Sequence, residues 1–149
     1  MNLFDKISED IKSAMLAKDK LKLEALRSVK KEFLEAKTAK GGTGELSDEA
    51  ATKILQKMVK QRKDSADIYT QQQRPELAEK ELAEVVVIEA YLPKQMTPEE
   101  LEIALKEIIT EINATGAQDM GKVMSIASKK LAGKTEGRAI SEKVKQLLQ

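Results

Sequence analysis

The sequence predicts an all-α protein, in which an N-terminal bundle of about four helices precedes a small C-terminal module of three helices. The strong helix formers Ala, Leu, Glu, Lys and Gln are abundant, whereas aromatic residues make up only 3% of the chain. No segment alternates apolar and polar residues over the length of a strand. Two prolines close together, Pro93 and Pro98, mark the strongest boundary along the chain.

Apolar residues recur at spacings of three and four along the first part of the chain, as in amphipathic helices. Phe4 and Ile7 begin the first such stripe. Asp19, and Ser47 with the acids that follow it, are suited to cap the second and third helices. Pro75 suits the first turn of a fourth helix. The expected helices span residues 3–17, 19–40, 48–72 and 75–92.

The fourth expected helix has a wide apolar arc that includes Leu82 and Val86, so we expect it to be the most buried element of the bundle. Arg62 lies near the inner face of the preceding helix, and Glu81 and Glu84 lie on the fourth. The favoured interpretation is an ion pair between the two helices that fixes their register. A substrate-binding arginine is the alternative.

The C-terminal part is expected to be a separate module. The predicted division is residues 1–92 for the bundle, 93–97 for a proline-containing linker and 98–149 for the module. Thr97 and Glu100 have the spacing of a capping box at the start of its first helix. The three expected helices span residues 98–113, 120–132 with Asp119 as N-cap, and 136–149, with Gly116 and Gly133 between them.

Several kinds of active site lack the residues they need. The chain has no Cys and no His, which removes thiolate nucleophiles, zinc clusters and the commonest general base. Gly41–Gly44 has neither the preceding strand nor the Gly-Lys-Ser/Thr ending of a phosphate-binding loop. Ser125 and Lys129 are four residues apart, but an exposed helix supplies neither a desolvated lysine nor an oxyanion hole. We expect no catalytic, cofactor-binding or metal-binding residues, and whether the protein takes part in an enzyme stays open.

The expected location is the cytoplasm, with no membrane partner. The first residues, Met1 to Lys6, reach an acidic residue too early for a secretory signal. The longest aliphatic run, Val85–Ile88, is far shorter than the roughly 20 residues of a membrane-spanning helix.

Charge is divided unevenly within the C-terminal module. Residues 97–119 hold six acidic residues and one basic residue, whereas residues 120–149 hold seven basic residues and two acidic ones. The basic segment has the charge needed to contact successive phosphates of a nucleic acid, although the acidic helix could instead neutralise it. The module has no aromatic residue, so any RNA contact is expected to be with backbone and shape. The candidate RNA-binding residues are Lys122, Lys129, Lys130, Lys134, Arg138 and Lys145.

The sequence resembles the YqeY family of small bacterial proteins at five segments, namely Leu26–Lys30, Lys60–Ser65, Glu76–Glu81, Tyr91–Met96 and Met120–Met124. That family is related to the C-terminal tail of the GatB chain of the glutamine-dependent aspartyl/glutamyl-tRNA amidotransferase. The resemblance implies a helical N-terminal part and a three-helix C-terminal module, and a tail that presents tRNA to the enzyme body. Lys122 matches a basic position of the tail, and Lys129, Lys130, Lys134 and Arg138 match more loosely. The family carries a carbon–nitrogen ligase label with glutamine as amide donor, but this chain lacks the residues for that chemistry.

Three hypotheses for the function remain. The first is a non-catalytic RNA-binding adaptor whose partner is tRNA. The second is an accessory subunit of a glutamine-dependent amidotransferase. The third is a helical protein–protein interaction module, which is suggested by the size of the N-terminal part, residues 1–92.

Overall fold

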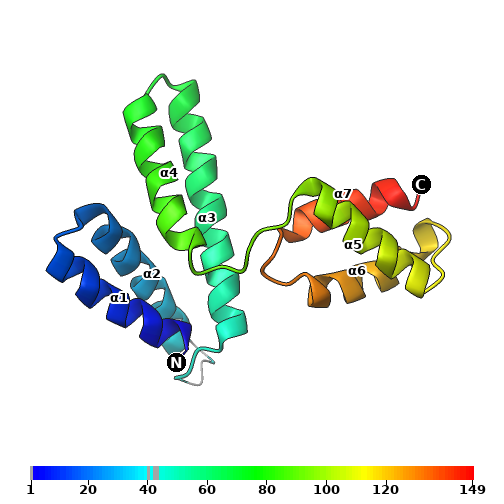
Figure 1. Cartoon of the computed structure of the whole chain (residues 1–149), viewed down its shortest axis with the longest axis horizontal. Helices are drawn as coiled ribbons and strands as arrows, with labels where there is room; N and C mark the ends of the chain where they lie inside the picture. Colours follow the sequence, from blue (N-terminus) through cyan, green and yellow to red (C-terminus); the bar gives the residue numbers. More distant parts are fainter. Residues whose placement is uncertain (1, 40, 42–43) are drawn as a thin grey trace. The chain divides into compact units, whose positions relative to one another are not determined.

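Residues 2–39, 41 and 44–149 are described by the computed structural model, and over these residues the chain is helical without strands (Figure 1). The expectation of an all-α protein is confirmed. Gly42 and Thr43 of the glycine-rich segment lie outside the described residues. The elements are α1 (Leu3–Ala17), α2 (Lys20–Thr38), α3 (Asp48–Gln71), α4 (Pro75–Glu89), α5 (Pro98–Glu111), the 3₁₀ helix η1 (Ala117–Asp119), α6 (Met120–Lys130) and α7 (Gly137–Leu147).

Polar side chains begin several helices where the sequence indicates. Asp19, Ser47 and Thr97 each accept a hydrogen bond from the backbone N–H three residues on, at 3.2, 3.1 and 3.1 Å. Asp119 does not cap α6 in this way, so that expectation is wrong. Its Oδ2 accepts from the N–H of Thr115 at 2.9 Å, because η1 leads directly into α6 and the carboxylate faces back toward the preceding loop.

Every α-helix after α1 ends one to three residues before its expected position, and α4 and α6 show why. α4 ends at Glu89 because the N–H groups of Tyr91 and Leu92 donate to carbonyls only three residues back, at 3.1 and 3.0 Å. α6 ends at Lys130, and the chain turns at Gly133, whose φ of 79° lies in the left-handed region that glycine adopts at low cost.

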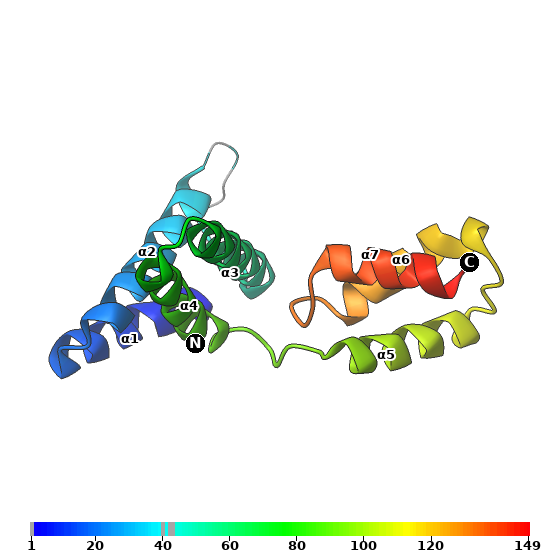
Figure 2. The same ribbon diagram turned by 90° about the horizontal axis from the view of Figure 1, so that it is seen from above.

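The chain divides into two compact units, Met1–Leu92 and Pro93–Gln149. In the first unit α1 lies beside α2 and α3 beside α4, and α2 also contacts both α3 and α4 (Figures 1 and 2). Each of these helices therefore turns one apolar side toward a shared core. The buried residues of that core are Ile7, Ala14, Leu26, Val29, Phe33, Ala51, Leu55, Met58, Val59, Val85 and Ile88.

α4 is less buried than its wide apolar arc predicts. Leu82 is 46% exposed and Val86 is 69% exposed, while Val85 and Ile88 face the core. The expectation that α4 is the most buried element is wrong, because α4 packs mainly along one side against α3 and leaves its far side in solvent. The width of a helix's apolar arc does not show how many other helices pack against it.

The expected ion pair between α3 and α4 is present. Nε of Arg62 lies 3.5 Å from Oε2 of Glu84, and both side chains are mostly buried. The guanidinium also donates from Nη2 to Oγ of Ser28 on α2 at 2.8 Å. Arg62 therefore ties three helices together, and among the described residues Glu81 takes no part in this contact.

In the second unit α5, α6 and α7 contact one another pairwise. Their amphipathic sides meet in one core that contains no aromatic residue. The buried members of that core are Leu101, Leu105, Ile108, Val123, Ala127, Leu131, Ile140, Val144 and Leu148.

The second half of the expected linker belongs structurally to this second unit. The N–H of Met96 donates to the carbonyl oxygen of Lys134 at 2.9 Å, and Nε2 of Gln95 donates to the carbonyl oxygen of Gly133 at 2.8 Å. These bonds hold residues 95–96 against the turn between α6 and α7. Because backbone carbonyls accept these two hydrogen bonds, the residue types in the turn do not predict them.

Candidate nucleic-acid interface

The geometry of α6 places two lysines on one exposed face. Val123 and Ala127 are buried in the core, and their positions fix which side of α6 points inward. Lys122 and Lys129 lie seven residues apart, which is close to two helical turns, and both are exposed. Their ammonium groups therefore extend from the same side of the helix into solvent.

Carboxylates neutralise part of the basic segment. Nζ of Lys130 lies 3.3 Å from Oε2 of Glu111 at the end of α5. Arg138 pairs with Glu142 one turn along α7, with Nε and Oε1 3.0 Å apart. Two of the candidate RNA-binding residues thus have an acidic partner, as the alternative interpretation of the charge pattern requires.

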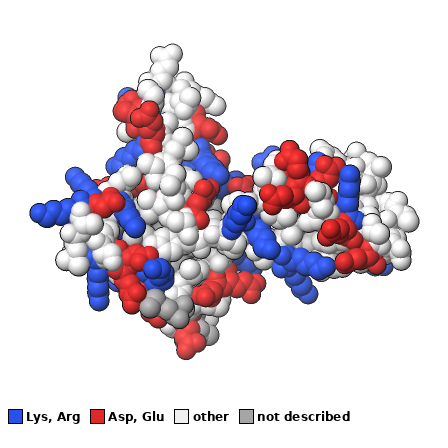
Figure 3. Space-filling model, in the orientation of Figure 1, with Lys and Arg blue, Asp and Glu red and all other residues white. Residues whose placement is uncertain are grey.

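Four candidate residues keep an uncompensated charge. Lys122, Lys129, Lys134 and Lys145 form no ion pair with any residue in the part of the chain that the structure describes. Lys134 lies in the turn before α7, and Lys145 lies in the last turn of α7. On the face shown in Figure 3, acidic side chains gather over α5 and basic side chains lie along the edge near α6. Lys122 and Lys129 share one helix face, whereas Lys134 and Lys145 come from other segments.

An open groove of about 420 Å³ adjoins Lys122. It lies between the end of α5 and the first half of α6. Besides Lys122 it is lined by Ile112, Gly121, Ser125 and Ile126. The charge pattern of the sequence gives no sign of this groove, because it depends on how α5 packs against α6.

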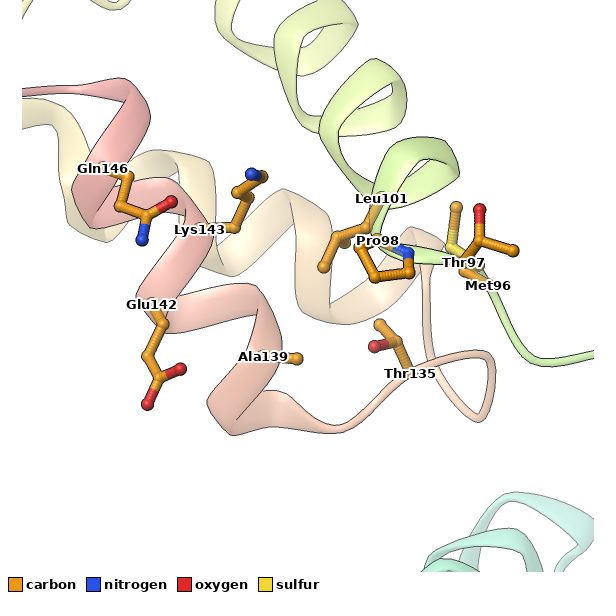
Figure 4. A pocket seen from close by; sticks show the side chains of 9 residues that line it. All are labelled: Met96, Thr97, Pro98, Leu101, Thr135, Ala139, Glu142, Lys143 and Gln146. Carbon is orange, nitrogen blue, oxygen red and sulfur yellow. The ribbon is translucent and has the colours of Figure 1, made fainter.

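A second groove, of about 270 Å³, lies between the start of α5 and α7 (Figure 4). Pro98, Leu101 and Ala139 contribute apolar surface, and Glu142 and Lys143 are polar members of its lining. Lys143 lies 3.8 Å from Glu102 and shares the groove with the carboxylate of Glu142. The local charge is therefore balanced, which makes this groove a poor site for an anion.

Asp10 and Tyr91, both in the first unit, are the two described residues whose pKa values are shifted. The hydroxyl of Tyr91 donates to Oδ2 of Asp10, joining the turn after α4 to α1. Burial, followed by this hydrogen bond and the nearby carboxylate, raises the pKa of Tyr91. Burial alone would raise the pKa of Asp10, but hydrogen bonds from Tyr91 and Lys6 outweigh it and hold that pKa below its ordinary value. The contact ties the segment after α4 to α1, so we assign it to stability.

The Ser125 and Lys129 side chains lack the buried setting that a Ser–Lys pair needs. Ser125 and Lys129 are both exposed on α6, so neither is desolvated. Among the described residues, no group of three or more His, Cys, Asp or Glu side chains is arranged to hold a metal ion. None of the described helices has the length and apolar character to cross a membrane.

Comparison with known proteins identifies relatives along nearly the whole chain. A family model described as Yqey-like protein matches residues 4–148. The chain is 33% identical over 117 residues to Altered inheritance of mitochondria protein 41, mitochondrial, of Clavispora lusitaniae, a match that covers 77% of this chain and 67% of the relative. It is 29% identical over 146 residues to the protein of the same name from Pyrenophora tritici-repentis, covering 96% of this chain and 79% of the relative.

These relatives correct two expectations. The resemblance implies a bacterial protein and the expected location is the cytoplasm, but the matching proteins come from fungi and are named as mitochondrial. Both expectations are therefore wrong. The absence of a secretory signal or a membrane span does not distinguish the cytoplasm from an organelle. The family expectation itself is confirmed: the chain belongs to the family of Yqey-like proteins.

Proposed function

We propose that this protein is a non-catalytic RNA-binding adaptor, with tRNA as its partner, and that α6 carries the principal contact. The observation that supports the proposal is the pair Lys122 and Lys129 on one exposed face of α6. Neither has an acidic partner among the described residues, whereas the adjacent Lys130 does. Two uncompensated cations on a rigid helix suit a polyanion, since each phosphate neutralised releases a condensed counterion.

The second unit favours contacts with the RNA backbone over contacts with bases. Recognition of single-stranded RNA depends mainly on bases that stack on aromatic side chains, and residues 93–149 contain none. Lysine contacts a phosphate as a point charge and carries no sequence information by itself. The proposal therefore predicts binding that distinguishes RNA by shape and depends little on its sequence.

The test is a titration of fluorescently labelled tRNA with the full chain, followed by anisotropy. The double charge reversal Lys122→Glu with Lys129→Glu is expected to weaken binding at least tenfold, because it replaces two attractive contacts with two repulsive ones. The matched control is Lys57→Glu with Lys60→Glu, which makes the same change of charge at two exposed positions of α3. Because the relatives are named as mitochondrial, mitochondrial tRNA belongs beside bulk tRNA in the titration.

Equal weakening by both double variants would mean that net charge alone drives the binding, and would refute the assignment to α6. Competition with double-stranded DNA adds a second criterion. An adaptor for tRNA should keep its labelled RNA in the presence of equal concentrations of DNA, whereas a general polyanion binder should lose it.

A second candidate function is a protein–protein interaction through the first unit. The observation that favours it is the exposure of Leu82 and Val86, four residues apart on one side of α4. A partner bound there should stay with the protein after nuclease treatment and should be lost from the variant Leu82→Ser with Val86→Ser. Co-purification that both serine substitutions leave intact would exclude this surface.

A further inference from the structure

Gly121 occupies the second position of α6 without a structural need for glycine. Its backbone lies in an ordinary helical conformation, and a Cβ atom added there would meet no atom within 4 Å. Two other glycines of the same unit differ. Gly133 has a φ of 79°, and a Cβ on Gly116 would lie 2.6 Å from Oε1 of Gln118. Alanine would favour the helix at position 121, and no contact within the described chain requires glycine there, which is also true of Gly137.

Gly121 lines the groove of about 420 Å³ between the end of α5 and α6. Because glycine has no side chain, the backbone of α6 forms part of the groove wall, and a ligand can approach it closely. The space that a Cβ would enter is the space of the groove. The groove is therefore open at this point because residue 121 has no side chain.

The lining of the groove matches a sugar–phosphate unit. Lys122 supplies a cation with no acidic partner among the described residues. The hydroxyl of Ser125 makes no hydrogen bond within the described chain, unlike Thr110, which donates back to a helix carbonyl at 2.9 Å. Ile112 and Ile126 add apolar walls against which the carbon face of a ribose can pack. The groove has no aromatic wall for a base.

We infer that this groove receives the sugar–phosphate backbone of the bound RNA, and that Gly121 is the residue that permits its close approach. The inference rests on the proposed RNA-binding function and adds the place on the protein where the RNA backbone lies. A phosphate contacts Nζ of Lys122 and Oγ of Ser125, and the adjoining ribose lies over Gly121. Lys129, about two turns further along α6, contacts the same strand outside the groove.

The experiment compares Gly121→Ala with Gly137→Ala in the full chain. Both glycines lie in the first turn of a helix, and a Cβ at either would meet no atom within 4 Å, but Gly137 does not line the groove. Each alanine is expected to raise Tm by roughly 2–8 °C, because it reduces the conformational freedom of the unfolded chain. Only Gly121→Ala is expected to weaken tRNA binding, by roughly fivefold or more, since the added methyl group occupies the contact position.

A second variant also obstructs the groove. Ser125→Met fills the groove from an exposed position without a change of charge and should also weaken binding, with Tm unchanged within roughly 2 °C. Loss of RNA affinity in both groove variants, with higher or unchanged Tm, supports the inference. A lower Tm for Gly121→Ala would contradict the assignment of glycine to ligand approach.

The proposed RNA binding and the proposed role of the groove can be refuted separately. If the wild-type chain binds tRNA and Lys122→Glu weakens binding, but Gly121→Ala and Ser125→Met bind as well as the wild type, the groove is overturned and RNA binding stands. If the wild-type chain binds no RNA at low salt, both the function and the groove are refuted.

Discussion

Nζ of Lys130 lies 3.3 Å from Oε2 of Glu111, whereas Lys129, the preceding residue, is exposed and has no ion pair among the described residues. Two adjacent lysines of α6 thus have different electrostatic roles. Lys130 joins α6 to α5, and Lys129 leaves its charge available to a ligand. The proposed RNA-binding surface therefore depends on which carboxylates α5 brings to α6.

Release of Lys130 from its partner should strengthen RNA binding. The variant Glu111→Gln removes the carboxylate and leaves an additional cation beside Lys129, so tRNA affinity is expected to rise roughly twofold to fourfold at low salt. Glu107→Gln is the matched control, because it removes the same charge from an exposed position of α5 that has no ion pair in the described structure. Fluorescence anisotropy measures both. An equal gain in the two variants would show a general charge effect in place of release of Lys130.

Arg62 should be a principal polar contributor to the stability of the first unit. The variant Arg62→Ala leaves Glu84 mostly buried without its cation and removes the bond to Ser28, at a cost of about 2–4 kcal/mol. Lys63 pairs with Glu89 in a more exposed setting, so Lys63→Ala should cost less than about 1 kcal/mol. Urea denaturation followed by circular dichroism gives both values. Similar losses for the two variants would contradict the role assigned to burial.

Tyr91 should stabilise the first unit over a defined range of pH. The pKa of Asp10 is lower in the folded protein than its ordinary 3.8, so its contribution is present above that value and is lost as pH falls through the folded pKa. The pKa of Tyr91 is raised above its ordinary 10.0, so its contribution is present below pH 10 and is lost as pH rises through the higher folded value.

The variant Tyr91→Phe tests this contact. At pH 7 it should unfold with a free energy about 1 kcal/mol lower than the wild type, since it loses a partly exposed hydrogen bond to a charged group. The difference should shrink below pH 3.8 and above pH 10. Denaturant titrations at acidic, neutral and alkaline pH provide the comparison. A difference that does not change with pH would assign the effect to packing of the ring.

Local signals in the sequence were sufficient for much of the fold. Asp19, Ser47 and Thr97 begin their helices as expected because a cap depends on residues only three positions apart. The exposure of Leu82 and Val86 could not be predicted in the same way. It depends on how many helices surround α4, which its own apolar pattern does not contain.

Prediction of the candidate site from the sequence is limited in the same way, by contacts between different helices. Charge counting located the basic segment, but it could not distinguish Lys129 from Lys130, because the partner Glu111 lies 19 residues away on another helix. The groove beside Gly121 was missed for the same reason. A signal was present in the sequence, namely a glycine next to a lysine within an expected helix, which is a position where alanine would favour helix formation. The RNA-binding role of the six basic residues and the accessory role beside an amidotransferase stay predictions.

The central claim is that Lys122 and Lys129 contact RNA phosphates, and the salt dependence of tRNA binding tests it most directly. For four uncompensated lysines the logarithm of the binding constant should fall against the logarithm of salt concentration with a slope of about −3 to −4. The variant Lys122→Ala with Lys129→Ala should reduce the steepness of that slope by about two. A slope that is the same in the variant and the wild type, or a wild-type chain that binds no tRNA at low salt, would contradict the account.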